Sequence, residues 1–267
     1  NHQLMYGNFI APLGLNYGGL VHNRHTRIPV IGRRQTLGHN LLTNLIAAFP
    51  LNEAADKRFD HWRQRAGNLT DTNTVTSAAN GVGDRAAEFV SANSEYLIAS
   101  TDGAFQIGNN DYSFCGWFYL TNKSASYAAL GCGFSDSSRE YFLQYSVGDD
   151  RFRYIAYNGG TVVGIRTAAS AGAPSAATWY FVCCRFSDSA NKVYISVNAG
   201  TVDDANTTGD PSTSGNFQLC IGRGHPSSGQ YWNGRISRVC LWRRFLSQDE
   251  IAWMYNNGRG RSFPFIV

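Results

Sequence analysis

Apolar and polar residues alternate along most of the chain with the two-residue period of β-strands. In residues 192–198, KVYISVN, three β-branched aliphatic residues alternate with a tyrosine and a serine. In residues 112–120, YSFCGWFYL, both faces are apolar, which predicts a strand covered on both sides. Many short strands of this kind, separated by turn-rich stretches, predict an all-β fold, an antiparallel two-sheet jelly-roll sandwich. Further strand-like runs lie at residues 141–147, 152–157, 178–186 and 217–222.

The pattern changes near the end of the chain, where the period becomes helical. Ser247 followed by Glu250 is a capping box, in which the hydroxyl accepts from a free amide and the carboxylate reaches back. Asn257-Gly258 supplies a left-handed stop. We therefore predict one short C-terminal helix whose buried face holds Ile251, Met254 and Tyr255.

Residues 1–40 show no sustained period and are interrupted by glycine and proline. A segment of this composition has little apolar surface to bury against itself. We predict an extended N-terminal arm over residues 1–40, followed by a single sandwich domain over residues 41–267.

The arm also holds the excess charge of the protein. Residues 1–52 contain four arginines, four histidines and no acid, and the remaining 19 of the 23 Lys and Arg residues balance 19 Asp and Glu residues. Extended backbone can add to a sheet edge and arginine can pair with carboxylates, so we predict docking on neighbouring protein subunits. Nucleic acid is the less favoured partner, since the arginines are not interleaved with aromatic residues. The docking residues are Arg24, Arg27, Arg33 and Arg34.

The six cysteines lie mostly inside strand-like apolar runs and form no C-x-x-C pair. Adjacent Cys183 and Cys184 point to opposite faces of a strand, so they cannot share one partner. We interpret the cysteines as small buried hydrophobic residues, which indicates folding in a reducing cytoplasm.

Several of these segments resemble laminin-G-like and concanavalin A-like lectin domains of the pentraxin type. The last of them is the most specific, because it is similar to the closing pattern G-x-I-D-x-V-x-I-W-x-R-x-L-S-x-x-E-I of that family, with Ser237 in place of the usual aspartate. The resemblance implies a jelly roll over residues 46–263 that works by binding. The segments are AAFPLNE at 47–53, AAEFVSANSEYL at 86–97, DYSFCGWFYL at 111–120, WYFV at 179–182, KVYISVN at 192–198, LCIGR at 219–223 and WNGRISRVCLWRRFLSQDEIAWMYNNG at 232–258.

The chain lacks the carboxylate pattern of the glucanases that this family includes. Retaining hydrolysis needs two carboxyl groups about 5 Å apart, and no E-x-D-x-x-E trio is present. We therefore expect no enzyme activity.

The family resemblance also implies a calcium site, because calcium takes hard oxygen ligands of the kind gathered at Asp203, Asp204 and Asp210. A solvated polar loop is the alternative interpretation of these three residues, and no other cofactor is expected.

Sugar binding requires an exposed aromatic ring beside hydrogen-bonding groups. Tyr231, Trp232 and Asn233 have the right side chains for a glycan-binding loop, and the turn at Tyr157-Asn158 has a similar composition. Trp232 has an equally good alternative place in the core, because it opens a strand-like run.

Together, these features predict a non-enzymatic binding subunit of a larger particle. A virus or phage surface protein, used for decoration or associated with the capsid, fits best: its arm would clamp a neighbour in a homo-oligomer or capsid, and its lectin-like sandwich would face outward from the virion. The alternative is a secreted or cell-surface glycan-binding adhesion module. No apolar run is long enough to span a membrane.

Overall fold

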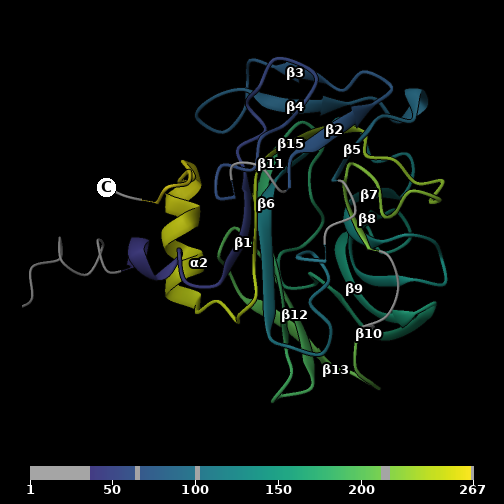
Figure 1. The fold of residues 1–267 in the computed structure, drawn as a ribbon, viewed down its shortest axis with the longest axis vertical. Coiled ribbons are helices and arrows are strands. Elements are labelled where there is room, and N and C mark those ends of the chain that lie inside the picture. The colour runs from purple at the N-terminus through teal and green to yellow at the C-terminus, as the bar shows by residue number, and fades with distance from the viewer. Residues whose placement is uncertain (1–36, 64–66, 100–102, 212–216, 266–267) are drawn as a thin grey trace, which may run out of the picture.

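The computed structural model describes residues 37–63, 67–99, 103–211 and 217–265. Within these ranges the strands pair antiparallel into two sheets that pack face to face (Figure 1), so the predicted sandwich is confirmed. The first, called here the β6 sheet, has the order β13-β12-β11-β6-β15-β4-β3, with β1 also paired to β15. The second, the β8 sheet, has the order β10-β9-β8-β7-β14-β5-β2.

The β6 sheet consists of β1 (Leu45–Phe49), β3 (Thr76–Ala78), β4 (Ala86–Phe89), β6 (Tyr112–Leu120), β11 (Trp179–Ser187), β12 (Lys192–Val197), β13 (Val202–Asn206) and β15 (Gly234–Trp242). The β8 sheet consists of β2 (Leu69–Thr72), β5 (Tyr96–Ala99), β7 (Tyr127–Gly133), β8 (Arg139–Ser146), β9 (Arg151–Gly159), β10 (Thr161–Thr167) and β14 (Gln218–Ile221). A short 3-10 turn, η1 (Ser91–Asn93), lies between β4 and β5, and the chain closes with α2 (Gln248–Tyr255) and the turn η2 (Asn256–Gly258).

The main core lies between the two sheets and follows the predicted alternation. On β6, Phe114 and Phe118 face this core, while Cys115 and Trp117 face a second apolar layer under α2. Cys183 and Cys184 divide between the same two layers, as expected for neighbours on a strand. All six cysteines are buried and unpaired, which confirms their interpretation as small core residues.

The helix α2 covers the outer face of the β6 sheet (Figure 1). Its predicted capping box is present, with the Glu250 amide donating to the Ser247 side chain and the Glu250 carboxylate accepting from the Ser247 amide at 2.8 Å. The helix ends one residue earlier than predicted, because Asn256 already has a left-handed conformation. No helix in the described parts of the chain has the length and hydropathy needed to cross a membrane.

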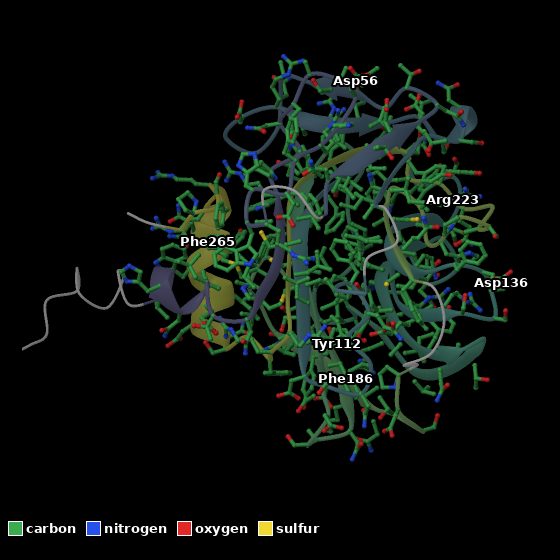
Figure 2. All side chains as sticks on the ribbon, viewed as in Figure 1. Asp56, Tyr112, Asp136, Phe186, Arg223 and Phe265 are labelled. Carbon is green, nitrogen blue, oxygen red and sulfur yellow. The ribbon has the colours of Figure 1, made fainter. Side chains whose placement is uncertain are left out.

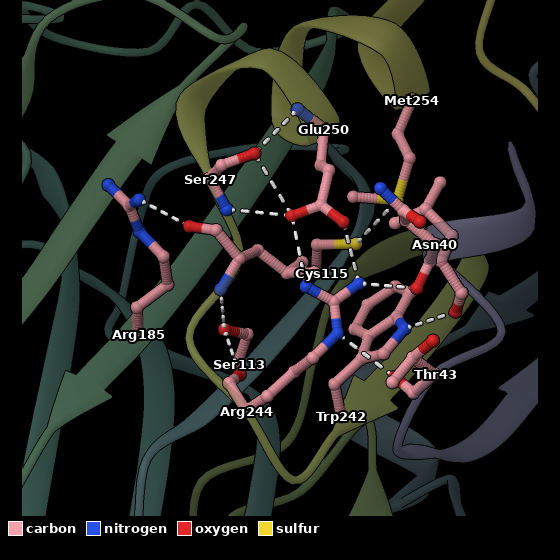
Figure 3. A network of polar contacts seen from close by, with 12 residues as sticks. Asn40, Thr43, Ser113, Cys115, Arg185, Trp242, Arg244, Ser247, Glu250 and Met254 are labelled. Carbon is pink, nitrogen blue, oxygen red and sulfur yellow. Dashed lines mark hydrogen bonds and ion pairs between the residues drawn. The ribbon is translucent and has the colours of Figure 1, made fainter. Parts of the chain in front are cut away.

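Glu250 also joins α2 to the beginning of the described chain. Arg244 pairs with both Glu250 oxygens, at 2.7 and 3.0 Å, and donates to the carbonyls of Asn40 and Thr43 at 2.9 Å (Figure 3). Residues 37–40 are helical rather than extended and lie against the body. The rest of the predicted arm, with Arg24, Arg27, Arg33 and Arg34, lies outside the described residues.

Candidate functional site

The outer face of the β8 sheet carries a small apolar cluster that is separate from the main core. Ala128, Phe142, Ile155 and Tyr157 form this cluster. Their strand neighbours, such as Tyr141 and Tyr154, point inward to the main core, so the alternation of β8 and β9 is what divides the two sets. The outer face is therefore an apolar floor on which polar side chains can be positioned.

The loop between β14 and β15, residues 222–233, crosses this floor. Two glycines allow the close approach. Any side chain at Gly131 on β7 would collide with the carbonyl oxygen of Gly224, and a Cβ at Gly224 would lie 2.6 Å from the Phe142 ring. The loop can thus lie flat on the sheet, and its outer part forms one wall of a hollow.

Arg223 connects the beginning of this loop to its end. Its guanidinium lies 4.7 Å from the ring centroids of both Tyr96 and Tyr231, and its Nε donates to the Ser228 carbonyl at 2.7 Å. Cation–π contacts on two sides and a main-chain hydrogen bond hold the loop in one conformation. The wall of the hollow is therefore preorganised.

The hollow has a volume of about 260 Å³ and opens away from the β6 sheet, on the side where Asp136 and Arg223 lie in Figure 2. The β7–β8 loop forms the wall opposite the β14–β15 loop. The lining of the hollow contains one carboxylate, one guanidinium, an imidazole, an amide, two hydroxyls and one aromatic ring. The lining residues are Asp136, Arg139, Phe142, His225, Ser227, Ser228, Gly229 and Gln230.

Asp136 is an exposed polar group of the hollow, and its carboxylate is held by two neighbouring side chains. Its side chain is 81% exposed, yet Oδ1 lies 3.1 Å from His225 Nε2 and 3.5 Å from Arg139 Nη1. Burial lowers the pKa of His225, although Asp136 opposes that shift, so the imidazole is neutral at neutral pH. The contact is then a hydrogen bond donated by Nε2–H, and His225 acts as a positioning residue for Asp136.

Arg139 supplies donors next to this acceptor. Its guanidinium lies over the Tyr157 ring at 4.1 Å from the centroid, and Nε donates to the Asp136 carbonyl at 3.2 Å. Within the described residues, its Nη2 has no hydrogen-bond partner. Because the ring and the carbonyl restrict the side chain, Arg139 presents N–H groups to the hollow with little rotamer freedom left to lose.

A row of polar side chains leads from the hollow across β8 to β9. The Gln144 amide, oriented to satisfy its neighbours, donates to Gln230 Oε1 at 3.1 Å and accepts from Arg153 Nε at 2.8 Å. Arg153 in turn pairs with Asp149 at 2.8 Å. Gln230, a lining residue, is therefore linked to Arg153, which lies outside the hollow.

Of the three predicted glycan-binding residues, only Tyr231 lies near this site, where it is half-buried against Arg223. Trp232 is fully buried in the main core, with Nε1 donating to the Arg235 carbonyl at 3.3 Å. It offers no face for a sugar, so its assignment as a platform is wrong and its alternative place in the core is the correct one. Asn233 is used structurally, since its side-chain oxygen accepts from the Ser91 amide at 3.3 Å.

The predicted calcium ligands do not converge. Asp203 and Asp204 are neighbours on β13, so their side chains point to opposite faces. Asp203 is buried and contacts Arg166 and Ser170, whereas Asp204 pairs with Lys192 at 2.8 Å. Asp210 is exposed in the following loop. The first two carboxylates are neutralised by cations, and across the described chain no group of three acidic, histidine or cysteine side chains is arranged for a metal.

Sequence reasoning missed Asp136, Arg139, Arg153 and His225. Two weak signals were available: RFRY at 151–154 places Arg151 and Arg153 on one strand face, and HPSSGQ at 225–230 is a polar loop between two strands. Nothing local shows that β7, β8 and β14 are neighbours, and this pairing is what brings the residues together.

Solved structures with this fold are similar to the chain at low sequence identity. The binding domain of Paraclostridial Mosquitocidal Protein 1 has a TM-score of 0.63 and 13% identity, covering 82% of this chain and 53% of its own. The binding domain of Botulinum Neurotoxin DC in complex with SialylT has a TM-score of 0.59 and 10% identity, covering 81% and 52%. The chain therefore spans about half the length of these two domains.

A third structure is similar over nearly its whole length. Domain 4 of AbnA, a GH43 extracellular arabinanase from Geobacillus stearothermophilus, in complex with arabinotriose, has a TM-score of 0.55 and 14% identity, covering 78% of this chain and 97% of its own. At such identities these structures show the fold alone.

A comparison with curated proteins finds no match. The sequence profile of the Concanavalin A-like lectin/glucanases superfamily (Laminin_G_3), however, matches residues 91–252, which include both loops of the hollow and most of the two sheets. The resemblance noted from the closing strand and helix is thereby confirmed, and the chain belongs to the Concanavalin A-like lectin/glucanases superfamily.

Proposed function

We propose that the chain is a lectin-like module that binds a glycan in the hollow on the outer face of the β8 sheet. The observation that supports this best is Asp136, a carboxylate that is exposed to solvent yet held in one orientation by His225 and Arg139. An exposed carboxylate normally loses rotamer freedom when it binds a ligand. The contacts with His225 and Arg139 already restrict the Asp136 side chain in the folded protein, so binding a ligand costs less side-chain entropy.

The chemistry of the lining suits sugar hydroxyls. The free lone pairs of Asp136 accept from two hydroxyls, while Arg139 and Gln230 donate to hydroxyl or ring oxygens. Phe142 contributes an apolar surface for the C–H groups of a sugar ring. Two of the similar structures are named as complexes with SialylT and with arabinotriose, which supports a carbohydrate ligand for this fold.

We infer that the module binds its ligand without cleaving it. Asp136 is the only carboxylate among the residues that line the hollow. Hydrolysis of a glycosidic bond by the common mechanisms requires a pair of carboxyl groups across the bond. A single acceptor fixed by a neutral histidine is suited to recognition.

The proposal is tested by removing the acceptor and the donor separately. Asp136→Asn and Arg139→Ala should each lower affinity for the best ligand on a glycan array by about tenfold or more, the value of one hydrogen bond to a charged group. Arg259→Ala is the matched control, because Arg259 is exposed and directly follows η2, next to the helix α2 that covers the outer face of the β6 sheet. Equal affinity in wild type and both site variants, measured by calorimetry, would contradict the proposal.

A role on a larger particle is a second candidate, favoured by the excess of basic residues in residues 1–52. In this proposal the arm docks on a neighbouring subunit and the module faces outward from a virion or other extracellular particle. Deleting residues 1–36 should abolish co-sedimentation with such a particle and leave the unfolding midpoint unchanged, since the contacts of Arg244 begin at Asn40. Retention of co-sedimentation by the truncated chain would exclude this role for the arm.

A further inference from the structure

The polar row that leaves the hollow continues to the last strand of the β8 sheet. Arg153 on β9 is paired in register with Thr167 on β10, and β10 is the last strand of the sheet. Together with the link from Gln230 through Gln144 to Arg153, this gives a continuous track across three strands, here called the edge track. Neighbouring strands are about 4.8 Å apart, so the edge track is longer than one sugar ring.

An apolar row runs beside the edge track. Phe142, Ile155 and Ile165 are paired across β8, β9 and β10. Phe142 is 8% exposed, where it lines the hollow, and Ile155 is 5% exposed, but Ile165 is 45% exposed at the edge. A ligand that follows the track would therefore meet hydrogen-bonding groups on one side and, at its far end, an apolar contact.

The charge along the edge track is positive. Arg153 is held by Gln144 and Asp149, and its side chain remains 27% exposed. Arg151 lies two residues away on the same strand face, and its guanidinium donates to the main-chain carbonyl of Asp150 at 2.7 Å. The carboxylate of Asp150 pairs with Lys123 at 2.9 Å. Three cations, Lys123, Arg151 and Arg153, therefore face two carboxylates, Asp149 and Asp150, and this site favours an anionic group.

We infer that the ligand is an acidic oligosaccharide, with one sugar in the hollow and the following sugars along the edge track. A neutral ring binds next to Asp136, which would repel an anion. A carboxylate or sulfate on a later sugar is held by Arg153 and Arg151. This inference rests on the proposed function and adds the length and the charge of the ligand to it.

The test uses the full chain and calorimetric titration with a neutral monosaccharide and with oligosaccharides of two to four sugars that carry one sialic acid at one end, each acidic chain beside its carboxyl-reduced counterpart. Affinity should rise with length up to about three sugars, as the track of three strands predicts. Acidic chains should bind about tenfold more tightly than reduced ones, and this preference should shrink as salt is raised.

Two variants locate the effect. Arg153→Gln should remove the preference for acidic chains and leave affinity for reduced chains within about twofold, because the amide keeps a donor. Ile165→Asp should weaken long chains only. Arg259→Gln is the matched control. A single sugar that binds as tightly as a tetramer, or equal affinity for acidic and reduced chains, overturns this inference while the proposed function stands.

Two other outcomes are also decisive. If Ile165→Asp changes the molar mass measured by light scattering and leaves all affinities unchanged, the edge of β10 is a contact between copies of this chain and the inference is wrong. If no sugar of any length or charge binds, the proposed function itself fails.

Discussion

Replacing Trp232 by alanine is expected to lower the free energy of unfolding by about 3–5 kcal/mol, the usual cost of a large aromatic residue removed from a core. The indole is fully buried, packs edge-to-face on Phe118 at 5.9 Å between ring centroids and donates its N–H to Arg235. Alanine would leave a cavity and remove this hydrogen bond. Urea denaturation followed by tyrosine and tryptophan fluorescence measures the loss.

Trp62→Ala is the matched control for this variant. Trp62 is partly exposed and contacts Phe263 at 6.0 Å between ring centroids, so its removal should cost much less. Trp232→Phe separates packing from ligand binding, since it keeps most of the apolar volume. A Trp232→Phe protein with unchanged stability and no glycan binding would show that the indole contacts the sugar after all.

The second large effect is expected at Glu140, whose carboxyl is buried at the start of β8. Oε1 accepts from the amides of Ile107 and Gly108 at 2.9 and 2.8 Å, whereas Oε2 is buried with no partner among the described residues. Burial raises the pKa of Glu140 to about 7, and the two amides only partly offset it. Glu140→Gln should therefore stabilise the protein at alkaline pH relative to wild type.

The direction follows from proton linkage. Between the ordinary pKa of 4.5 and the folded value of about 7, the folded wild-type protein binds more protons at this site than the unfolded chain. The contribution of the Glu140 carboxyl to the free energy of unfolding is therefore most favourable below pH 4.5. It falls by roughly 3 kcal/mol in total as the pH rises to about 7. Glutamine does not titrate, so its variant should lack this decline.

Unfolding free energies at pH 4, 6 and 8 check the prediction. At pH 4 the side chain at position 140 is neutral in both the folded wild type and the folded variant, and it accepts from the same two amides. This measurement therefore gives the effect of the substitution itself. A difference between wild type and Glu140→Gln that stays constant from pH 4 to pH 8 would mean that the pKa of Glu140 is the same in the folded protein and in the unfolded chain, which would contradict the prediction.

The strands and the helix were predictable because their signals are local. The alternation in β6 and β12 and the capping box at Ser247 each lie within a few consecutive residues, and the structure reproduces them. Trp232 was ambiguous for the same reason: it precedes the first residue of β15, where the alternation does not yet fix which side a residue faces.

The candidate site could not be predicted because it depends on which strands are neighbours. His225 and Asp136 are 89 residues apart in the sequence and meet only because β14 pairs with β7. Hydrophobic patterning determines which face of a strand is buried, but the order of strands in a sheet is set by the packing of the whole domain.

The pairing of Arg244 with Glu250 fixes where a linker would join the module. Residues 37–40 lie against the body next to α2, whereas Asp136 lies at the opposite side of the sandwich (Figures 1 and 2). A module tethered at residue 37 would present its hollow away from the tether. Anchoring and recognition can then take place together, and several copies fixed to one surface could bind a shared polymer with increased avidity.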